Sequence, residues 1–251
     1  MGREGFCRNI KCGQEGVWYI MRICGLNKTT LLDYPGHVAA TVFLGGCNFR
    51  CPFCQNGDLV LKPEGQPAIE KEAVMAFLRK RKGVLTGVCI TGGEPTIERG
   101  LEELIEEIKD IGYLLKLDTN GYCPEVIRKL TAKGLVDYIA MDIKNDLKKY
   151  GETVGIQGID AGRIMDSIRW IINGKTDYEF RTTVVKELHG REDMSAIGKA
   201  IKGAKAYFLQ GYQESGGVIA PGFHAYGKEE MEELAEWVRP FVPNVQLRGV
   251  E

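Results

Sequence analysis

Residues 38–54 read VAATVFLGGCNFRCPFC. The first seven are apolar except for one threonine, and several are β-branched, which is typical of a strand buried on both faces of a parallel sheet. Two glycines end this strand, and Cys47, Cys51 and Cys54 follow within eight residues. Because parallel α/β sheets bind ligands at the carboxyl ends of their strands, this segment predicts a fold class and the edge at which a site lies.

Beyond this strand, the chain alternates between short apolar strands and amphipathic helices. The helix expected at 101–111 carries Leu101, Leu104, Ile105 and Ile108 on one face and acidic residues on the other. Such alternation predicts a parallel sheet with right-handed crossovers, and six units fall short of a closed eight-stranded barrel. We therefore predict an α/β fold, a partial (β/α)6 barrel, with strands at 38–44, 87–91, 114–118, 138–142, 178–185 and 206–210. The expected helices lie at 70–81, 101–111, 124–133, 160–173, 194–202 and 228–241.

The composition limits the classes of partner. The 251 residues include 33 Lys and Arg and 34 Asp and Glu, a formal net charge of -1, which gives no electrostatic reason to expect nucleic acid or an anionic membrane surface. No apolar run approaches the length of a membrane span, and the first residues lack the apolar core of a signal peptide. We expect a cytoplasmic protein with a glycine-containing N-terminal extension, residues 1–20, and one domain, residues 21–251.

Three of the eight cysteines form the strongest motif. Three thiolates in one tight loop can each bind one iron of an iron–sulfur cube, and no fourth cysteine lies nearby in sequence, so one iron would be open to a ligand. The first alternative is zinc, which usually needs a second cysteine pair or added histidines, and His37, His189 and His224 lie far off in sequence. The second is a purely structural cysteine group. The spacing favours a [4Fe–4S] cluster on Cys47, Cys51 and Cys54.

The CxxxCxxC spacing, with Phe53 just before the last cysteine, resembles the signature of the radical S-adenosylmethionine (SAM) superfamily. The resemblance implies that the open iron binds the amino and carboxylate groups of SAM and that Phe53 lies close to its adenine. It also implies that one electron from the cluster cleaves SAM to methionine and a 5′-deoxyadenosyl radical. The expected partial barrel is then of the radical SAM type. This is chemistry that a cofactor supplies and a protein positions.

The second predicted strand ends in Gly92-Gly93-Glu94-Pro95. Two glycines allow the backbone to approach a ligand closely. The segment resembles the GGEP motif of the superfamily, which receives the amino group of SAM. The alternative is a plain turn between a strand and a loop, which these residues also suit.

The third and fourth strands also end in polar residues, Asp118-Thr119 and Asp142-Ile143-Lys144. The Asp-x-Lys element resembles that of glycyl-radical-enzyme activating proteins. The resemblance implies that Lys144 meets the SAM carboxylate, a task that suits a point charge on a flexible stem, and that Asp142 meets its cationic or ribose end. The alternative is an ordinary surface ion pair between Asp142 and Lys144.

Related activating proteins also bind a monovalent cation beside SAM. Oxygen atoms of Asp118, Thr119, Met141 and Asp142 could bind such a hard cation here. The alternative for this stretch is a helix cap at Asn120.

Three further residues have less certain positions. Arg181 lies in the fifth strand: if its face lines the barrel it could bind the carboxylate or ribose of SAM, and if not it is a solvated charge. Gln210, at the end of the sixth strand, could contact the adenine edge. His189 lies near the place where the family's activating proteins often carry a histidine, although not clearly in register.

The remaining cysteines have weaker claims. Cys89 lies within a predicted strand and is expected in the core, whereas Cys123 could be buried or exposed. Cys7, Cys12 and Cys24 could bind zinc or a second cluster. That set is short of ligands, so a tail without a metal is the favoured interpretation.

A longer resemblance concerns the substrate. The segment TLLDYPG at 30–36, followed by CNFRCPFCQN at 47–56, resembles the anaerobic ribonucleoside-triphosphate reductase activating protein family, from about residue 21 to the sixth strand. The resemblance implies that the adenosyl radical removes a hydrogen atom from a glycine of a partner glycyl-radical enzyme, the anaerobic ribonucleotide reductase. It also implies reduced flavodoxin or ferredoxin as the electron donor.

Two other functions stay open on the sequence. The same parts could act on a small molecule, as in the radical SAM enzymes of deazaguanine biosynthesis. An iron–sulfur electron carrier without SAM chemistry is the other. The GGEP and Asp-x-Lys elements argue against the carrier, which needs neither.

Overall fold

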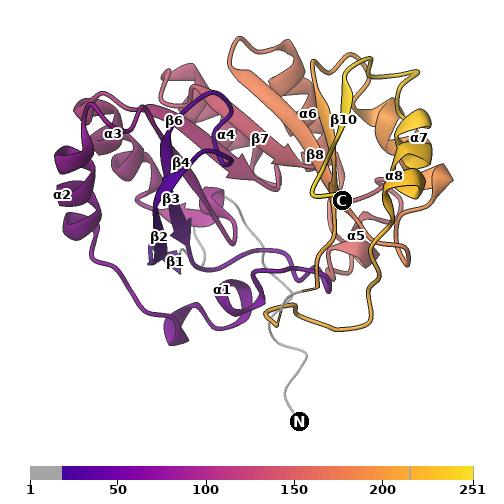
Figure 1. Ribbon diagram of the computed structural model, residues 1–251, viewed down its shortest axis with the longest axis horizontal. Helices are drawn as coiled ribbons and strands as arrows, with labels where there is room; N and C mark the ends of the chain where they lie inside the picture. Colours follow the sequence, from indigo (N-terminus) through magenta and orange to yellow (C-terminus); the bar gives the residue numbers. More distant parts are fainter. Residues whose placement is uncertain (1–18, 215, 251) are drawn as a thin grey trace.

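The computed structural model describes residues 19–214 and 216–250 (Figure 1). Eight strands form one sheet in the order β10-β9-β8-β7-β6-β4-β3-β2, in which every neighbouring pair is parallel except β2 and β3. A separate short pair joins β1 (Tyr19–Ile20) to β5 (Glu98–Arg99). The strands of the large sheet are β2 (Ile23–Thr30), β3 (Ala39–Leu44), β4 (Gly87–Gly92), β6 (Leu114–Thr119), β7 (Tyr138–Asp142), β8 (Asp177–Val184), β9 (Tyr207–Gly211) and β10 (Val245–Arg248).

Helices cover the outer face of the curved sheet, as Figure 1 shows. Among the described residues, the edge strands β2 and β10 do not pair with each other, so the barrel is open. The expectation of a partial α/β barrel is confirmed, and all six predicted strands are present. The helices are α1 (Gly57–Leu61), α2 (Lys71–Arg81), α3 (Leu101–Ile111), α4 (Pro124–Ala132), α5 (Tyr150–Thr153), α6 (Gly162–Asn173), α7 (Arg191–Ala200) and α8 (Lys228–Glu236).

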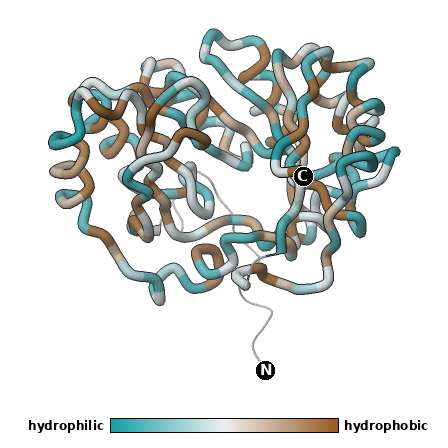
Figure 2. The backbone as a smooth tube through the Cα atoms, viewed as in Figure 1, coloured by the Kyte–Doolittle hydropathy of each residue, from teal (hydrophilic) through white to brown (hydrophobic). Residues whose placement is uncertain are grey.

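The core lies between the outer face of the sheet and these helices. In α3 the apolar stripe expected from the sequence is buried, with Leu104, Ile105 and Ile108 fully covered. Burying each such side chain contributes about 1.5–3 kcal/mol relative to leaving it exposed. In Figure 2, hydrophilic and hydrophobic residues alternate along the outer helices, which is how a helix covers a sheet on one side and faces water on the other.

Several elements differ from the expectation. The sequence pattern did not predict β2, β10, α1 or α5. Helix α7 begins three residues earlier than expected, because Asp193 accepts a hydrogen bond from the Gly190 N–H at 2.9 Å and so caps its first turn. Helix α8 ends at Glu236 rather than at 241. The predicted extension, residues 1–20, lies almost wholly outside the described residues, so that division of the chain stays a prediction.

The TLLDYPG segment closes the amino-terminal end of the barrel. Asp33 accepts a hydrogen bond from the Thr41 hydroxyl at 2.5 Å, and the buried ring of Tyr34 lies 5.9 Å from that of Tyr138 across the sheet. A Cβ atom at Gly87 would stand 2.7 Å from the Tyr34 ring, so this position requires glycine. The segment therefore covers the amino-terminal ends of the strands, at the opposite end of the barrel from the cysteine loop.

Within the described ranges, no helix combines the length and apolar character needed to cross a membrane.

Candidate active site at the carboxyl ends of the strands

Cys47, Cys51 and Cys54 line one cavity of about 250 Å³ at the carboxyl ends of the parallel strands. The other residues that the sequence assigned to this rim line the same cavity. They are Phe53, Gly92, Gly93, Glu94, Asp118, Thr119, Asp142, Lys144, Arg181 and Gln210.

The spacing of the buried thiols suits a cluster better than a single zinc ion. Burial raises the pKa of Cys51 to about 12 and also raises that of Cys47, so a bound metal has to displace their protons. In the part of the chain that the structure describes, no three His, Cys, Asp or Glu side chains are placed to hold a single metal ion. A zinc site needs such convergence, whereas the iron atoms of a cube stand apart, each with its own thiolate.

The cysteine loop is held in shape by its own arginine. Arg50 donates through Nη1 to the carbonyl oxygens of Cys47 and Phe49, at 2.6 and 2.7 Å. The Phe49 N–H lies 3.3 Å from the Cys47 sulfur, a contact that favours a thiolate. The buried Phe49 ring packs edge-on against the rings of Tyr122 and Tyr150. Contacts within the protein thus hold the loop in this shape.

A segment after β9 returns to the same loop. The backbone N–H of Ala220 donates to the Pro52 carbonyl at 2.8 Å, and that of Ile219 to the Cys54 carbonyl at 3.3 Å. The Phe53 ring is buried and lies 5.9 Å from the ring of Phe223. These contacts hold the end of the cysteine loop against the segment after β9.

The glycine pair is required by the cysteine loop itself. A Cβ atom at Gly92, which has φ +130°, would stand 2.1 Å from the Leu44 carbonyl oxygen, and one at Gly93 would stand 1.8 Å from that of Gly46. The Gly93 and Glu94 N–H groups donate to these carbonyls, at 2.9 and 2.8 Å. The sequence had suggested close approach to a ligand, and the structure adds a close approach of β4 to the residues just before Cys47.

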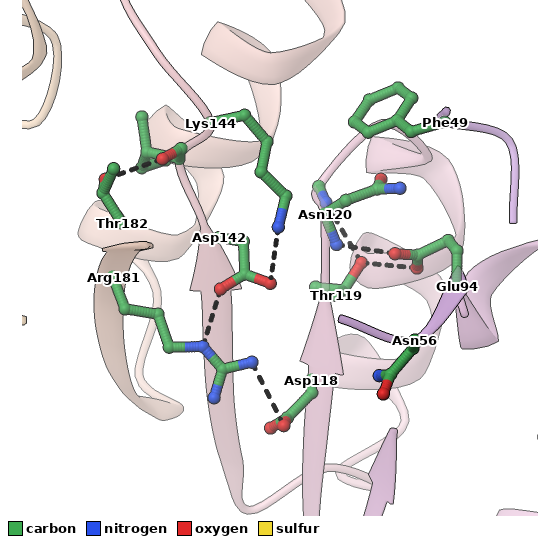
Figure 3. Close-up of polar contacts among 12 residues, drawn as sticks. Phe49, Asn56, Glu94, Asp118, Thr119, Asn120, Asp142, Lys144, Arg181 and Thr182 are labelled. Atoms are coloured by element: carbon green, nitrogen blue, oxygen red, sulfur yellow. Dashed lines mark hydrogen bonds and ion pairs between the residues drawn. The ribbon is translucent and has the colours of Figure 1, made fainter. Parts of the chain in front are cut away.

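The carboxylate of Glu94 joins two loops. Its Oε1 accepts hydrogen bonds from the Thr96 N–H (3.0 Å), the Thr96 hydroxyl (2.5 Å) and the Thr119 hydroxyl (2.7 Å). Its Oε2 accepts from the Asn120 N–H at 2.6 Å (Figure 3). Burial raises the pKa of Glu94, and these donated hydrogen bonds oppose that rise. Glu94 therefore fixes the loop after β6 relative to the loop after β4.

A chain of alternating charges crosses the cavity wall (Figure 3). Lys144 donates to Asp142 at 3.1 Å, and Arg181 donates through Nε to the other Asp142 oxygen at 2.7 Å. Arg181 Nη2 lies 3.1 Å from Asp118 Oδ2, and Lys116 donates to Asp118 Oδ1. Burial alone would raise the pKa of Asp142, but Arg181 and Lys144 outweigh it and lower that pKa to about 2. The charged state of this wall is therefore fixed at neutral pH.

The structure decides three alternatives that the sequence left open. Arg181 faces the cavity, because its guanidinium group lies between Asp118 and Asp142, and it is not a solvated charge. Asp142 and Lys144 are only 22% and 19% exposed, so they are not a surface ion pair. Asn120 is not a helix cap, since α4 starts at Pro124 with Cys123 as its N-cap residue. The side chain of Met141 is fully buried in the core.

His189 is buried behind the cavity. Its Nδ1 accepts a hydrogen bond from the Val185 N–H at 3.1 Å, which leaves Nε2 to donate to the Lys144 carbonyl at 2.7 Å. Burial lowers the pKa of His189, so the neutral ring is the stable form. Its ring also packs edge-on against that of Phe53 at 5.9 Å. The histidine thus supports Lys144 and Phe53 from behind.

The sequence did not single out Lys116 or Asn48, and it named Asn120 only as a helix cap. Lys116 is 2% exposed and lies two residues before Asp118. Strand alternation puts both side chains on one face, and this pattern in the sequence could have identified Lys116. Asn120 Nδ2 donates to Asn48 Oδ1 at 2.7 Å. That contact joins loops 72 residues apart and had no sequence signal.

The other cysteines in the described ranges do not line the cavity. Cys89 is buried, as expected, and Cys123 is buried too. Cys24 Sγ would stand 2.8 Å from a Cβ atom at Gly45, behind the cysteine loop. Cys7 and Cys12 lie outside the described residues, so a metal on these three stays untested.

Two sequence comparisons bear on this site. A Methanocaldococcus jannaschii protein, provisionally named a glycyl-radical enzyme activating enzyme, is 30% identical over 244 residues, which cover 91% of this chain and 96% of that protein. A 7-carboxy-7-deazaguanine synthase of Thermococcus kodakarensis is 32% identical over 130 residues, 44% of this chain and 51% of the synthase.

The fold and the family agree. The structure of Streptococcus suis SuiB bound to S-adenosylmethionine superposes with a TM-score of 0.63 at 17% identity, over 81% of this chain and about half (48%) of SuiB. The family model of the radical SAM superfamily matches residues 41–238, which include the cysteine loop and all four strand ends that supply the cavity's charged residues. This chain belongs to the radical SAM superfamily and is a radical SAM enzyme, whose family cofactors are a [4Fe–4S] cluster and SAM.

Proposed function

We propose that this chain cleaves SAM reductively and generates a glycyl radical on a partner enzyme. When bound, the cluster supplies the one electron that splits SAM into methionine and a 5′-deoxyadenosyl radical. That radical takes a hydrogen atom from the Cα of a partner glycine. The products are 5′-deoxyadenosine and a glycyl radical on the partner.

The residues present fit both groups. Three thiols supply three of the four corner ligands of a cube, which leaves one iron for SAM. Buried cations beside the thiols suit the negative charge of a thiolate-bound cluster and of the SAM carboxylate. We propose Cys47, Cys51 and Cys54 as cluster ligands and Phe53, Gly92, Gly93, Glu94, Asp118, Thr119, Asp142, Lys144 and Arg181 as SAM-binding residues.

Lys144 has the central orienting role in this proposal. Its ammonium group is bound on one side by Asp142, and the negative charge of Cys51 is among the causes that raise its pKa, against the effect of burial. It is therefore a permanent positive charge between the thiols and the strand-end carboxylates. From there it can meet the SAM carboxylate next to the open iron, while Asp142 meets a positive or hydroxyl group of SAM.

The partner class follows from the relative and from the space available. The Methanocaldococcus jannaschii relative, of which 96% aligns with this chain, is provisionally named a glycyl-radical enzyme activating enzyme. The cavity of about 250 Å³ is lined by the residues proposed for the cluster and SAM, which leaves little room there for a second small substrate. A glycine loop that enters through the open barrel satisfies both observations. The cavity composition is the observation that carries this proposal.

Finer details stay predictions. They are the anaerobic ribonucleotide reductase as the partner, reduced flavodoxin or ferredoxin as the donor, and a cytoplasmic location. A monovalent cation bound beside SAM is also a prediction. The carboxylates of Asp118 and Asp142 already share Lys116, Arg181 and Lys144, with which an added cation would compete.

The test uses reconstituted, dithionite-reduced protein, in which 5′-deoxyadenosine is quantified after SAM is added, with and without a candidate glycyl-radical enzyme. We expect formation of the nucleoside and, on the partner, a glycine-centred electron paramagnetic resonance (EPR) signal. Product without a partner effect would favour a small substrate, a reading that the partial match to the deazaguanine synthase makes worth testing. No product from a protein with an intact cluster would favour an electron carrier.

A further inference from the structure

Two side chains that line the active-site cavity, Thr183 and Gln210, make no hydrogen bond to any of the described residues. Both are only partly buried, and neither has a fully covered polar atom without a partner, so their polar groups are accessible. Apart from Thr91 and the cysteines, the other polar side chains of the cavity bond to the protein, as Glu94 and Arg181 do. Thr183 and Gln210 are therefore available to a bound molecule.

The two side chains stand next to each other on neighbouring strands. β8 and β9 run parallel, and Thr183 is the register partner of Gln210. Thr183 lies two residues after Arg181, which also lines the cavity, so strand alternation puts both on the inner face of the barrel. A glutamine amide has two N–H donors and a carbonyl acceptor, and a threonine hydroxyl can donate or accept. The pair is thus a neutral surface that both donates and accepts hydrogen bonds.

The pair lies towards the edge strand β10 of the open barrel. Gln210 is in register with Arg248 of β10, whereas the proposed SAM-binding residues lie in the cysteine loop and at β4, β6, β7 and β8. Arg248 also lies on the inner face, where it donates through Nη1 and Nη2 to the buried Glu179 at 2.7 and 2.8 Å. Its side chain is 34% exposed. A loop that enters past β10 would meet Arg248 first and Gln210 next.

The chemistry of the proposed substrate matches this neutral surface. The hydrogen atom comes from a glycine, which has no side chain, so contacts that place its Cα have to be made to the peptide groups on either side. Each peptide group has one N–H donor and one carbonyl acceptor. A primary amide can bond to both, which a fully charged group cannot do.

We propose that Gln210 and Thr183 bind a peptide group of the partner's glycine loop and so place the glycine Cα beside the cavity. The Gln210 amide pairs with the N–H and carbonyl groups of the loop, and the Thr183 hydroxyl supplies one further hydrogen bond. The inference rests on the proposed function and names the residues that recognise the partner's loop. The competing guest is the adenine edge of SAM, which also carries donors and acceptors.

The test measures the partner and SAM as separate ligands of the reduced holoenzyme. Gln210→Leu and Thr183→Val keep the approximate shapes of the side chains and remove their hydrogen-bonding groups, and a double variant combines them. The EPR signal of the glycyl radical, recorded over a range of concentrations of a candidate glycyl-radical enzyme, gives the KM for the partner. Equilibrium dialysis with labelled SAM gives the SAM affinity. In the double variant we expect the KM to rise about tenfold and the SAM affinity to change less than about twofold.

A matched control is Thr131→Val. Thr131 donates to the Ile127 carbonyl within α4 at 2.8 Å and does not line the cavity. Both values are expected to equal those of the wild type in this variant.

Three results would overturn the proposal. A SAM affinity about tenfold weaker with an unchanged KM for the partner would assign the pair to the adenosine part of SAM. No change in either value would show that the pair binds neither. If the variants lose the cluster, hydrogen–deuterium exchange of the wild-type holoenzyme with SAM replaces them. The partner should then slow exchange at the end of β9 and just after it, and equal exchange with and without the partner is the third overturning result.

A failure of the proposed function is seen earlier and separately. A wild type that forms no radical on the partner would overturn both proposals before any variant is compared. A wild type that activates the partner, with variants that keep its KM, would overturn this inference alone.

Discussion

Arg181 binds Asp142 through Nε at 2.7 Å while its Nη2 reaches Asp118 at 3.1 Å, so one guanidinium group joins the ends of β6 and β7. All three side chains are less than a quarter exposed. Because the arginine satisfies one oxygen of each carboxylate, the remaining oxygen of each is left to a lysine: Lys144 on Asp142 and Lys116 on Asp118. Each lysine can therefore be substituted without removing the partner of the other carboxylate.

Lys144→Ala should weaken SAM binding at least tenfold and leave the cluster in place. The variant removes the positive charge next to the thiols but none of the proposed ligands, so iron content is expected to equal that of the wild type. Equilibrium dialysis with labelled SAM measures the affinity. Lys149→Ala, which removes a half-exposed lysine paired with Asp193, is the matched control. Equal SAM affinity in Lys144→Ala and the wild type would remove Lys144 from the SAM site.

Lys116→Met should make SAM cleavage depend on an added monovalent cation. The substitution keeps the length of the buried side chain but leaves Asp118 with one cation fewer, so Na⁺ or K⁺ gains a place to bind. Rates of 5′-deoxyadenosine formation in Na⁺, K⁺ and the bulky choline ion measure this. The wild type is expected to respond several-fold less than the variant. A wild type that already requires Na⁺ or K⁺ would show that a cation displaces Lys116.

Cys51→Ala should abolish the cluster, because only two thiolates remain in the loop. Iron and sulfide analysis after anaerobic reconstitution measures the result, together with the loss of the visible absorption of the cluster. Cys89→Ala is the control, since Cys89 is a buried cysteine outside the loop. Full iron content in Cys51→Ala would refute the assignment of the ligands.

Glu98→Gln should stabilise the protein at alkaline pH. Burial raises the pKa of Glu98 to about 8, and neither carboxylate oxygen has a hydrogen-bond partner in the described part of the chain. Below the unfolded-state pKa the group is neutral in both states. As the pH rises from there to about 8, the unfolded chain ionises and the folded one does not, so the free energy of unfolding falls.

The size of this effect can be bounded. Each pKa unit corresponds to about 1.4 kcal/mol, so Glu98→Gln is expected to add ~2–5 kcal/mol at pH 8 and nothing at pH 4. Urea unfolding midpoints measured over this pH range check it. Glu107→Gln alters a partly exposed glutamate that pairs with Lys71 and serves as the control. Parallel pH profiles for Glu98→Gln and the wild type would contradict the account.

Much of the fold could be predicted because buried parallel strands have a strong sequence signal. β3 and β4 are continuous apolar runs followed by glycines, and α3 has its apolar residues at helical spacing. β2 has no such signal: it is an edge strand whose second half, Asn27 to Thr29, is polar and exposed. β10 is four residues long, too short for periodicity to identify.

The position of the site could be predicted from the sequence, but most of the contacts that support its residues could not. The residues predicted to bind the cluster and SAM line one cavity, because the ends of parallel strands converge at one edge. The supporting contacts depend on distances between loops that a sequence does not contain. Glu94 was expected at SAM, and its oxygens are seen to accept four hydrogen bonds from the protein. His189 was close to its family position in sequence, but only the fold shows it behind Lys144 and Phe53.

The most direct test of the central claim follows one hydrogen atom. A candidate glycyl-radical enzyme is prepared with glycine deuterated at Cα and incubated with SAM and the reduced holoenzyme, and the 5′-deoxyadenosine is analysed by mass spectrometry. We predict one deuterium per nucleoside, in step with a glycyl radical on the partner. Unlabelled 5′-deoxyadenosine, formed at the same rate with and without that enzyme, would contradict hydrogen abstraction from its glycine.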